Sequence, residues 1–294
     1  MEGTTKQVKM KKIMLQMMAA AIFSLNGFLS AGDAVPEYPC YRLATAPVMN
    51  GKADDAGWQQ LPESGAFFIH GGKDYAIEKR TFFRSGWTDD SLYLQVKCFE
   101  PLTEKMKAST TDGDVLWADD AIEMFFQPAT DTSYFQLVAN SVGARWNAVG
   151  PDSKTARPWN WEVKSGKWEK GWLVEVRIPF AVLGKTPKTG EKWPVNIARD
   201  ITTGPVVESA TCWAPVQNGF NNLERFGHFV FSGEPAVTQQ VKKDETKLNE
   251  PFYQYLKDQC ATKIKAAGQA ELLAALDNPA LAAESKPVRE VLAQ

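Results

Sequence analysis

The sequence predicts an all-β protein, an antiparallel β-sandwich of jelly-roll type with a short α-helical extension at the C-terminus. Three observations predict this fold class. Apolar and polar residues alternate in several short runs, as in strands with one buried face. Turn-forming pairs such as Asn50-Gly51 and Gly71-Gly72 separate these runs. Near the C-terminus, the apolar residues recur at helical spacing instead.

The composition is that of a globular protein and disfavours several functional classes. Of 294 residues, 44% are hydrophobic and 23% are charged, which disfavours a disordered chain. The net charge of −2 provides no basic surface for nucleic acid. Because only 2 histidines accompany 10 tryptophans, a histidine-rich metal site or a histidine-dependent triad is not expected. The common phosphate-binding, serine-hydrolase and zinc-protease motifs do not occur.

Residues 1–34 have the three parts of a secretory signal peptide. Lys11 and Lys12 precede a mostly apolar stretch, and small residues lead to Ala34. We expect cleavage after Ala34 and a secreted, periplasmic or cell-surface protein; an uncleaved N-terminal anchor is the alternative. No second apolar run of spanning length follows, so the mature chain has no predicted membrane span.

The predicted sandwich covers residues 35–233, and its clearest strand is 91–99. In that run Leu92, Leu94 and Val96 point one way, while the residues between them point the other way. Five tryptophans in such runs or their turns are predicted to be core residues, because large apolar side chains are usually buried. They are Trp58, Trp87, Trp172, Trp193 and Trp213, whereas Trp146, Trp159 and Trp161 are candidates for an outer wall. The other predicted strands are 81–87, 121–127, 133–140, 172–178, 193–199 and 227–231.

Residues 234–294 predict a polar linker followed by two or three short amphipathic helices. Phe252, Tyr255, Leu256 and Ile264 recur at helical spacing, which gives an apolar stripe. We expect the stripe to dock on the sandwich, or alternatively to bind a protein partner.

Four cysteines remain after removal of the signal peptide: Cys40, Cys98, Cys212 and Cys260. In an oxidising compartment they would form up to two disulfides, in one of three pairings that the sequence does not distinguish. Cys98 and Cys212 also fit buried small residues. None of the four has the spacing of a zinc site.

Five sequence segments resemble motifs of the family 9 carbohydrate-binding modules, and they occur in the same order and at similar spacing. They are 47–58 (PVMNGKADDAGW), 86–94 (GWTDDSLYL), 117–125 (WADDAIEMF), 171–180 (GWLVEVRIPF) and 225–227 (RFG). The match extends over nearly the whole predicted sandwich. The resemblance implies a β-sandwich that binds sugars and often carries structural calcium.

The resemblance implies that a sugar lies between the aromatic side chains of Trp117 and Phe220. An aromatic ring covers the C–H face of a pyranose ring, and Glu123 is placed to hydrogen-bond its hydroxyls. The family usually has tryptophan where this sequence has Phe220, so the second wall is smaller here. The other candidate polar ligands are Asn140, Gln217 and Arg199.

Two pairs of adjacent carboxylates, Asp89-Asp90 and Asp119-Asp120, are candidate calcium ligands. Calcium prefers carboxylate and carbonyl oxygens, which loops with such pairs provide. The alternative is that the pairs cap turns, which is the commoner role of aspartate in loops. Beyond this structural calcium, we expect no required cofactor.

We therefore expect a secreted, non-catalytic protein that binds a plant-type polysaccharide or oligosaccharide. One alternative is a glycoside hydrolase or accessory enzyme domain that uses Glu123 and Glu175, because such enzymes need two carboxyl groups that flank one bond. A second alternative is a haem-binding sandwich with Met49, Met124 and the two histidines as candidate ligands. No haem-attachment motif occurs.

Overall fold

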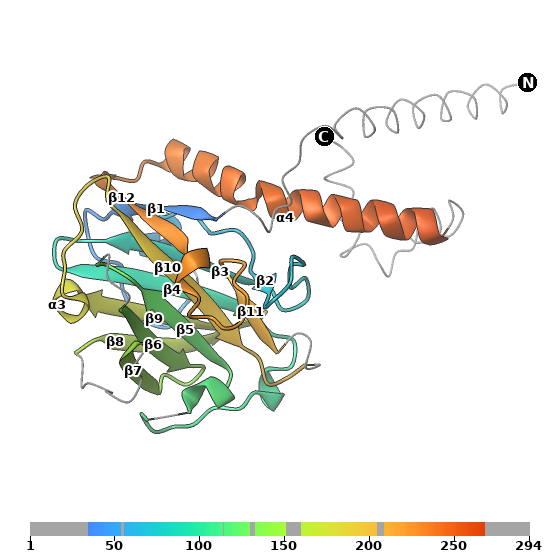
Figure 1. Ribbon diagram of the computed structural model, residues 1–294, viewed down its shortest axis with the longest axis horizontal. Coiled ribbons are helices and arrows are strands. Elements are labelled where there is room, and N and C mark those ends of the chain that lie inside the picture. Colours follow the sequence, from blue (N-terminus) through green and yellow to red (C-terminus); the bar gives the residue numbers. More distant parts are fainter. Residues whose placement is uncertain are drawn as a thin grey trace, which may run out of the picture. The chain divides into compact units, whose positions relative to one another are not determined.

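The computed structural model describes residues 35–53, 56–113, 115–129, 133–150, 160–204 and 209–267, so the predicted signal peptide and Trp159 lie outside the described residues. Most elements are strands (Figure 1). The strands are β1 (Glu37–Arg42), β2 (Phe68–Ile69), β3 (Thr81–Trp87), β4 (Ser91–Phe99), β5 (Ala121–Phe126), β6 (Tyr134–Asn140), β7 (Arg145–Gly150), β8 (Glu162–Trp168), β9 (Gly171–Pro179), β10 (Lys192–Asp200), β11 (Ala210–Cys212) and β12 (Gly227–Pro235). The helices are α2 (Ala56–Gln59), α3 (Phe180–Leu183) and α4 (Thr238–Ala267), with 3-10 turns η1 (Thr103–Lys105), η2 (Leu116–Ala118) and η4 (Leu223–Arg225).

The strands form one mixed sheet that curls into a nearly closed barrel or sandwich. Their order is β7-β6-β5-β10-β12-β1-β3-β4-β9-β8, with β11 beside β10 and β2 beside β11. The coarse prediction of a strand-built domain with a C-terminal helix is therefore confirmed, and the jelly-roll type stays a prediction.

The prediction of a purely antiparallel sheet is wrong at β1. This strand runs parallel to both neighbours, with Tyr38 opposite Phe229 of β12 and Tyr41 opposite Gly86 of β3. A tight turn forces consecutive strands to be antiparallel, whereas long connections leave the direction free. The chain between β1 and β3 is the long segment 43–80, and β1 and β12 are the first and last strands in the sequence. No short turn therefore fixes the direction of β1 relative to either neighbour.

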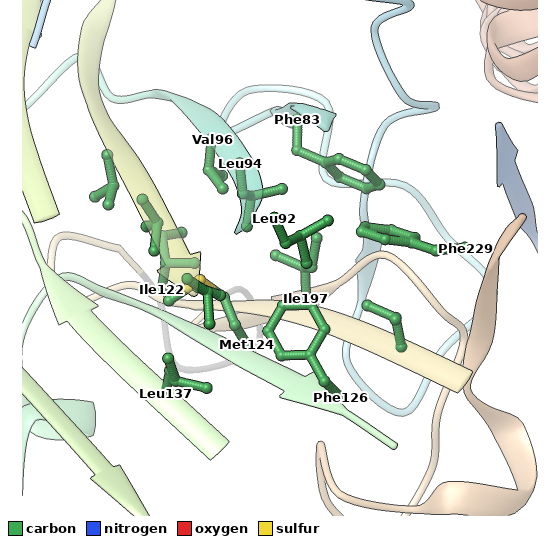
Figure 2. Packing of buried hydrophobic residues seen from close by; sticks show 14 of the residues in the cluster. Phe83, Leu92, Leu94, Val96, Ile122, Met124, Phe126, Leu137, Ile197 and Phe229 are labelled. Atoms are coloured by element: carbon green, nitrogen blue, oxygen red, sulfur yellow. The ribbon is translucent and has the colours of Figure 1, made fainter. Parts of the chain in front are cut away.

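The main hydrophobic core lies between the two halves of the curled sheet. From β4, Leu92, Leu94 and Val96 pack toward Met124 of β5 and Ile197 of β10 (Figure 2). The alternation predicted for 91–99 is thus confirmed for the core face. The residues between them are buried too, because α2 and the turn at residues 50–51 cover the other face of β4.

The five tryptophans predicted as core are all buried: Trp58, Trp87, Trp172, Trp193 and Trp213. Trp161, a candidate for an outer wall, is also wholly buried, and its indole N–H donates to Asn147 Oδ1 at 2.9 Å. The outer-wall role of Trp161 is therefore wrong, because a residue enclosed on all sides has no face for a ligand.

Residues 238–267 form one long helix, α4, in the part of the C-terminal segment where a polar linker was predicted to begin, and residues 268–294 lie outside the described residues. The glutamines, lysines and glutamates of 239–247 are good helix formers, so a polar composition does not by itself indicate a linker. Phe252 packs against Tyr75 and Phe82, and Tyr41 donates to Asp244 at 2.5 Å. The described part of α4 therefore docks on the domain. No helix in the described ranges has the length and apolar character needed to cross a membrane.

All four cysteines are free thiols, and no disulfide links them. Cys40 and Cys98 belong to the main core, and Cys212 lies in a separate apolar cluster. Burial raises the pKa of Cys98 and of Cys212 to about 12, because a thiolate loses its hydration there. Burial raises the pKa of Cys40 as well. Cys260 on α4 is the partly exposed one.

We expect one cysteine, Cys260, to react quickly with an aromatic disulfide reagent in the native protein, and all four after denaturation. The reactive species is the thiolate, which the three buried sites disfavour. Absorbance titration of released thiolate checks this count, and Cys260→Ser serves as the control that abolishes the fast phase. The unfolding midpoint should be the same with and without reductant; a lower midpoint in reductant would indicate a disulfide.

Candidate functional site

Glu123 lies on the outer face of β5. Ile122 and Met124 of the same strand point into the core, and successive side chains of a strand point to opposite faces. The cross-strand neighbours of Glu123 are Val138 on β6 and Ala198 on β10. Glu123 is thus a carboxyl group with apolar neighbours on both strands beside it, and the residue is only 7% exposed.

A second carboxyl group meets Glu123 on this face. Asp200 at the end of β10 lies diagonally across from it, because Ala198 pairs with Glu123 and Asp200 pairs with Ala121. A hydrogen bond joins the two carboxyl groups. The amide of Gln136 on β6 donates to Glu123 Oε2 at 2.6 Å. We call Glu123, Asp200 and Gln136 the acid site.

Burial raises the pKa of both carboxyl groups, because the charged form loses hydration. The pKa of Asp200 is raised well above its ordinary range by burial, by repulsion from Glu123 and by the hydrogen bond to it. Hydrogen bonds with Gln136 and Asp200 partly offset the rise for Glu123. The pair therefore retains one shared proton at pH values where isolated carboxyl groups are ionised.

Trp117 stands beside the acid site on the β6 side. It belongs to η2, which packs on β5 and β6 through the buried Leu116. Its side chain is 42% exposed, and its ring meets Trp146 edge-on, with ring centroids 5.5 Å apart. Trp146 pairs with Val138, which in turn pairs with Glu123. Trp117 and Trp146 thus form an aromatic wall whose outer ring is open to solvent.

Phe220 stands on the opposite, β10 side. It packs against the apolar cluster that contains Ala198 and Cys212, and its carbonyl accepts a hydrogen bond from Asn196 Nδ2 at 2.9 Å. The imidazole of His70 meets the Phe220 ring edge-on, with centroids 4.8 Å apart. Burial lowers the pKa of His70, which keeps its ring neutral near neutral pH. The acid site therefore has an aromatic side chain on each side.

Gln217 lies in the same loop as Phe220. Its side chain is exposed, and its carbonyl accepts a hydrogen bond from Asn222 Nδ2 at 3.1 Å. The strand register thus places Glu123 between β6, on whose side Trp117 lies, and β10, on whose side the loop of Gln217 and Phe220 lies.

Asn140 is a structural residue, which corrects the prediction that it binds sugar. Its Nδ2 donates to the Ser109 carbonyl at 2.7 Å and to Asp119 Oδ2 at 2.9 Å. Its Oδ1 accepts from the amides of Val142 and Ala144. An amide side chain has two donors and two acceptor positions. All of them are used to hold the turn between β6 and β7.

Arg199 is also wrongly predicted as a ligand residue. It is 0% exposed and lies on the core face of β10, opposite to the face of Asp200. Its guanidinium donates to Glu100 at 3.0 Å and to the carbonyls of Lys79 and Phe99. Pairing with Glu100 compensates the buried charge, which explains why an arginine is stable at this position.

The four aspartates predicted as calcium ligands make contacts within the fold. Asp119 and Asp120 accept hydrogen bonds from the amides of Ser109 and Lys107, as turn-capping carboxylates do. Asp89 pairs with Arg42 and Asp90 with Arg177. No group of three or more metal-binding side chains gathers in the described ranges. Calcium at these positions thus stays a prediction without a ligand set.

The sequence of this chain matches a known family of protein domains. A family model described as "Carbohydrate family 9 binding domain-like" matches residues 49–234, more than half of the chain. The chain belongs to the family 9 carbohydrate-binding modules.

The solved structures similar to this module include the following three. A Bacteroides uniformis ATCC 8492 protein of proposed carbohydrate-binding function has 17% identity and a TM-score of 0.54, covering 68% of this chain and 100% of its own. A family 9 module from Caldicellulosiruptor kristjanssonii in complex with glucose has 17% identity and a TM-score of 0.50, covering 67% and 96%. The same organism's module in complex with cellotriose has 16% identity and a TM-score of 0.50, covering 67% and 94%. These likenesses support the fold; no curated protein sequence matches the chain.

The hydrolase alternative depends on Glu123 and Glu175, which the module keeps apart. Val174 and Val176 point into the core, so Glu175 faces outward from β9, whereas Glu123 faces outward from the opposing half of the sheet. Glu175 is wholly buried and accepts hydrogen bonds from the amides of residues 50 and 51 and from Gln95. Two carboxyl groups on opposite sides of a core do not flank one glycosidic bond.

The candidate haem ligands are equally dispersed in the module. Met124 is enclosed in the main core, Met49 packs against a separate cluster around Trp58, and His228 lies on β12. His70 meets Phe220 at the site described above. These residues do not offer two axial ligands to one iron.

Gln136 and Asp200 were not identified from the sequence, and His70 was identified only as a candidate haem ligand. Gln136 shares a face with Val138 and Asn140 by simple alternation, which the predicted strand 133–140 already contained. Asp200 required knowledge of which strand pairs with β5, and His70 required knowledge of where the Phe220 loop folds. These pairings link segments far apart in the sequence, so local patterns do not contain them.

Replacing Asp200 by asparagine is expected to stabilise the module near pH 8 and to have little effect near pH 4. A carboxyl group whose folded pKa is raised stabilises the fold below its unfolded pKa, and this contribution is lost as the pH rises toward the folded pKa. The neutral amide avoids that loss, with an expected gain on the order of 1 kcal/mol near pH 8. Thermal unfolding at both pH values measures it. Glu250→Gln, on the exposed side of α4, should show no such difference.

Proposed function

We propose that the module binds a polysaccharide or oligosaccharide on the face that contains the acid site. The observation that carries this proposal is the placement of Glu123 between two aromatic side chains, Trp117 and Phe220. An aromatic ring covers the flat C–H face of a sugar ring, and each such contact contributes on the order of 1 kcal/mol beyond burial. Carboxylates accept hydrogen bonds from the hydroxyls at the sugar rim.

The family and its solved neighbours support carbohydrate as the class of ligand. Two of the similar structures were determined in complex with glucose and cellotriose. Those sugars are ligands of the neighbours, and a related ligand for this chain is our proposal. Phe220 presents a smaller ring than a tryptophan would, so we expect weaker stacking on that side.

We propose that binding occurs without catalysis. A glycoside hydrolase needs two carboxyl groups that act on one bond from opposite sides. Glu123 and Asp200 instead share a proton in direct contact, which leaves no space for a sugar bond between them. Release of reducing ends from a bound polysaccharide, abolished by Glu123→Gln, would contradict this part of the proposal.

We also propose that residues 1–34 direct export and are then removed. When the full chain is expressed in a bacterium, we expect the mature protein outside the cytoplasm, with an N-terminus at or near Val35. N-terminal sequencing of the exported fraction tests this. A chain that keeps its first residues and sediments with membranes would support the anchored alternative instead.

Replacing Trp117 by alanine is expected to weaken sugar binding about tenfold or more, because the substitution removes one aromatic wall. Titration calorimetry with the oligosaccharides that a glycan array identifies measures the affinity. Tyr253→Ala is the matched control, because Tyr253 is an aromatic residue with 51% exposure on α4 and far along the chain from the site.

Two results would contradict the proposed function. One is that the wild-type protein binds no soluble or insoluble glycan. The other is that Trp117→Ala and Phe220→Ala both bind as tightly as Tyr253→Ala. In either case circular dichroism and thermal unfolding establish that the variants are folded.

A further inference from the structure

The acid site carries negative charge that no cation compensates within the described residues. The charged groups that raise the pKa of Asp200 are Glu123 and Asp120, and both are acidic. The strand neighbours of Glu123 on β6 and β10 are apolar, and Gln136 is a neutral amide. Oδ2 of Asp200 is buried and has no hydrogen-bond partner in the described part of the chain.

The nearest cationic residue in the sequence does not reach this site. Arg199 precedes Asp200 directly but points to the core face, where it is bonded to Glu100. On the side of β2, His70 contributes a neutral ring. A pair of buried carboxyl groups without a cation keeps one proton, because two adjacent negative charges repel each other. A ligand that supplies a positive charge would replace that proton.

We propose that the acid site makes the module select sugars with a protonated amine, such as 2-amino-2-deoxy sugars, over neutral sugars, and reject uronic acids. This inference rests on the proposed function and specifies the class of sugar. An ammonium group donates charge-assisted hydrogen bonds to carboxylates, which are stronger than those of a hydroxyl. A uronate would place a third negative charge beside Glu123 and Asp200.

The proton balance of binding follows from the shared proton. When the ammonium of the ligand bonds to Glu123 and Asp200, the proton shared by the two carboxyl groups leaves to solvent and both groups become carboxylates. Binding of an amino sugar therefore releases up to one proton, whereas binding of a neutral sugar releases none. The affinity for the amino sugar increases with pH until the amine of the ligand itself loses its proton.

The experiment compares ligands that differ only at carbon 2. Titration calorimetry of the full-length mature chain is performed with a β-1,4-linked glucosamine oligomer, its N-acetylated form and a cello-oligosaccharide of equal length. A galacturonate oligomer is the acidic probe. At a pH where the amine is protonated, we expect the glucosamine oligomer to bind about tenfold or more tightly than the two neutral oligomers. Two buffers of different ionisation enthalpy give the number of protons released.

Variants distinguish an effect of the acid site from an effect of the protein's overall negative charge. Asp200→Asn and Glu123→Gln should bring the ratio of glucosamine to cello-oligosaccharide affinity close to one and abolish proton release. Glu250→Gln, which removes one exposed charge on α4, should leave the ratio as it is. Trp117→Ala should weaken the binding of every oligomer that binds. That result would show that the amino sugar occupies the same face as the neutral sugars.

The possible failures are distinguishable. Equal affinity for the amino and neutral oligomers, or tight binding of the galacturonate oligomer, would overturn the selectivity and leave the proposed function intact. Selectivity that survives both acid-site substitutions would also overturn it. If none of the oligomers binds, the proposed function fails together with this inference.

Discussion

The burial of apolar side chains between the two halves of the sheet is the interaction on which the rest of the structure depends. Burial stabilises a fold by roughly 25 cal/mol per Å² of apolar surface. The core of Figure 2 joins β4 to β5 and β10 through residues such as Leu94, Met124 and Ile197. Since side chains alternate along a strand, this core forces Glu123 and Asp200 to the outer face. The acid site is thus a consequence of how the core is packed.

Hydrogen-bond partners distinguish the structural polar residues from the candidate functional ones. Asn140, Arg199 and Glu175 are buried with several partners each, so their polar groups are satisfied by the fold itself. Asp200 is different, because its buried Oδ2 has no hydrogen-bond partner in the described residues and a second carboxyl group lies beside it, and both raise the cost of ionising it. Buried ionisable groups whose pKa is strongly shifted are typical of functional sites. This cost is what a ligand at the aromatic-flanked face would relieve.

The long helix α4 stabilises strands other than those that carry the acid site. It packs through Phe252 on Tyr75 and Phe82, and Glu245 pairs with Arg84 of β3. These contacts stabilise β3 and the segment that follows β2, to which Tyr75 belongs. His70 follows β2 directly, so the position of His70 against Phe220 depends in part on a segment that helix docking supports.

The sequence by itself determined the strand character of 91–99 and 121–127, the burial of five tryptophans, and the aromatic and carboxyl residues Trp117, Phe220 and Glu123 as candidates. Period-two alternation is local, so it is readable without the fold. Only the tertiary structure decided that Asp200 meets Glu123, that Arg199 pairs with Glu100 inside the core, and that β1 is parallel to its neighbours. The physical reason is that strand pairing joins segments far apart in the chain. Which polar group finds a partner there depends on the register of that pairing.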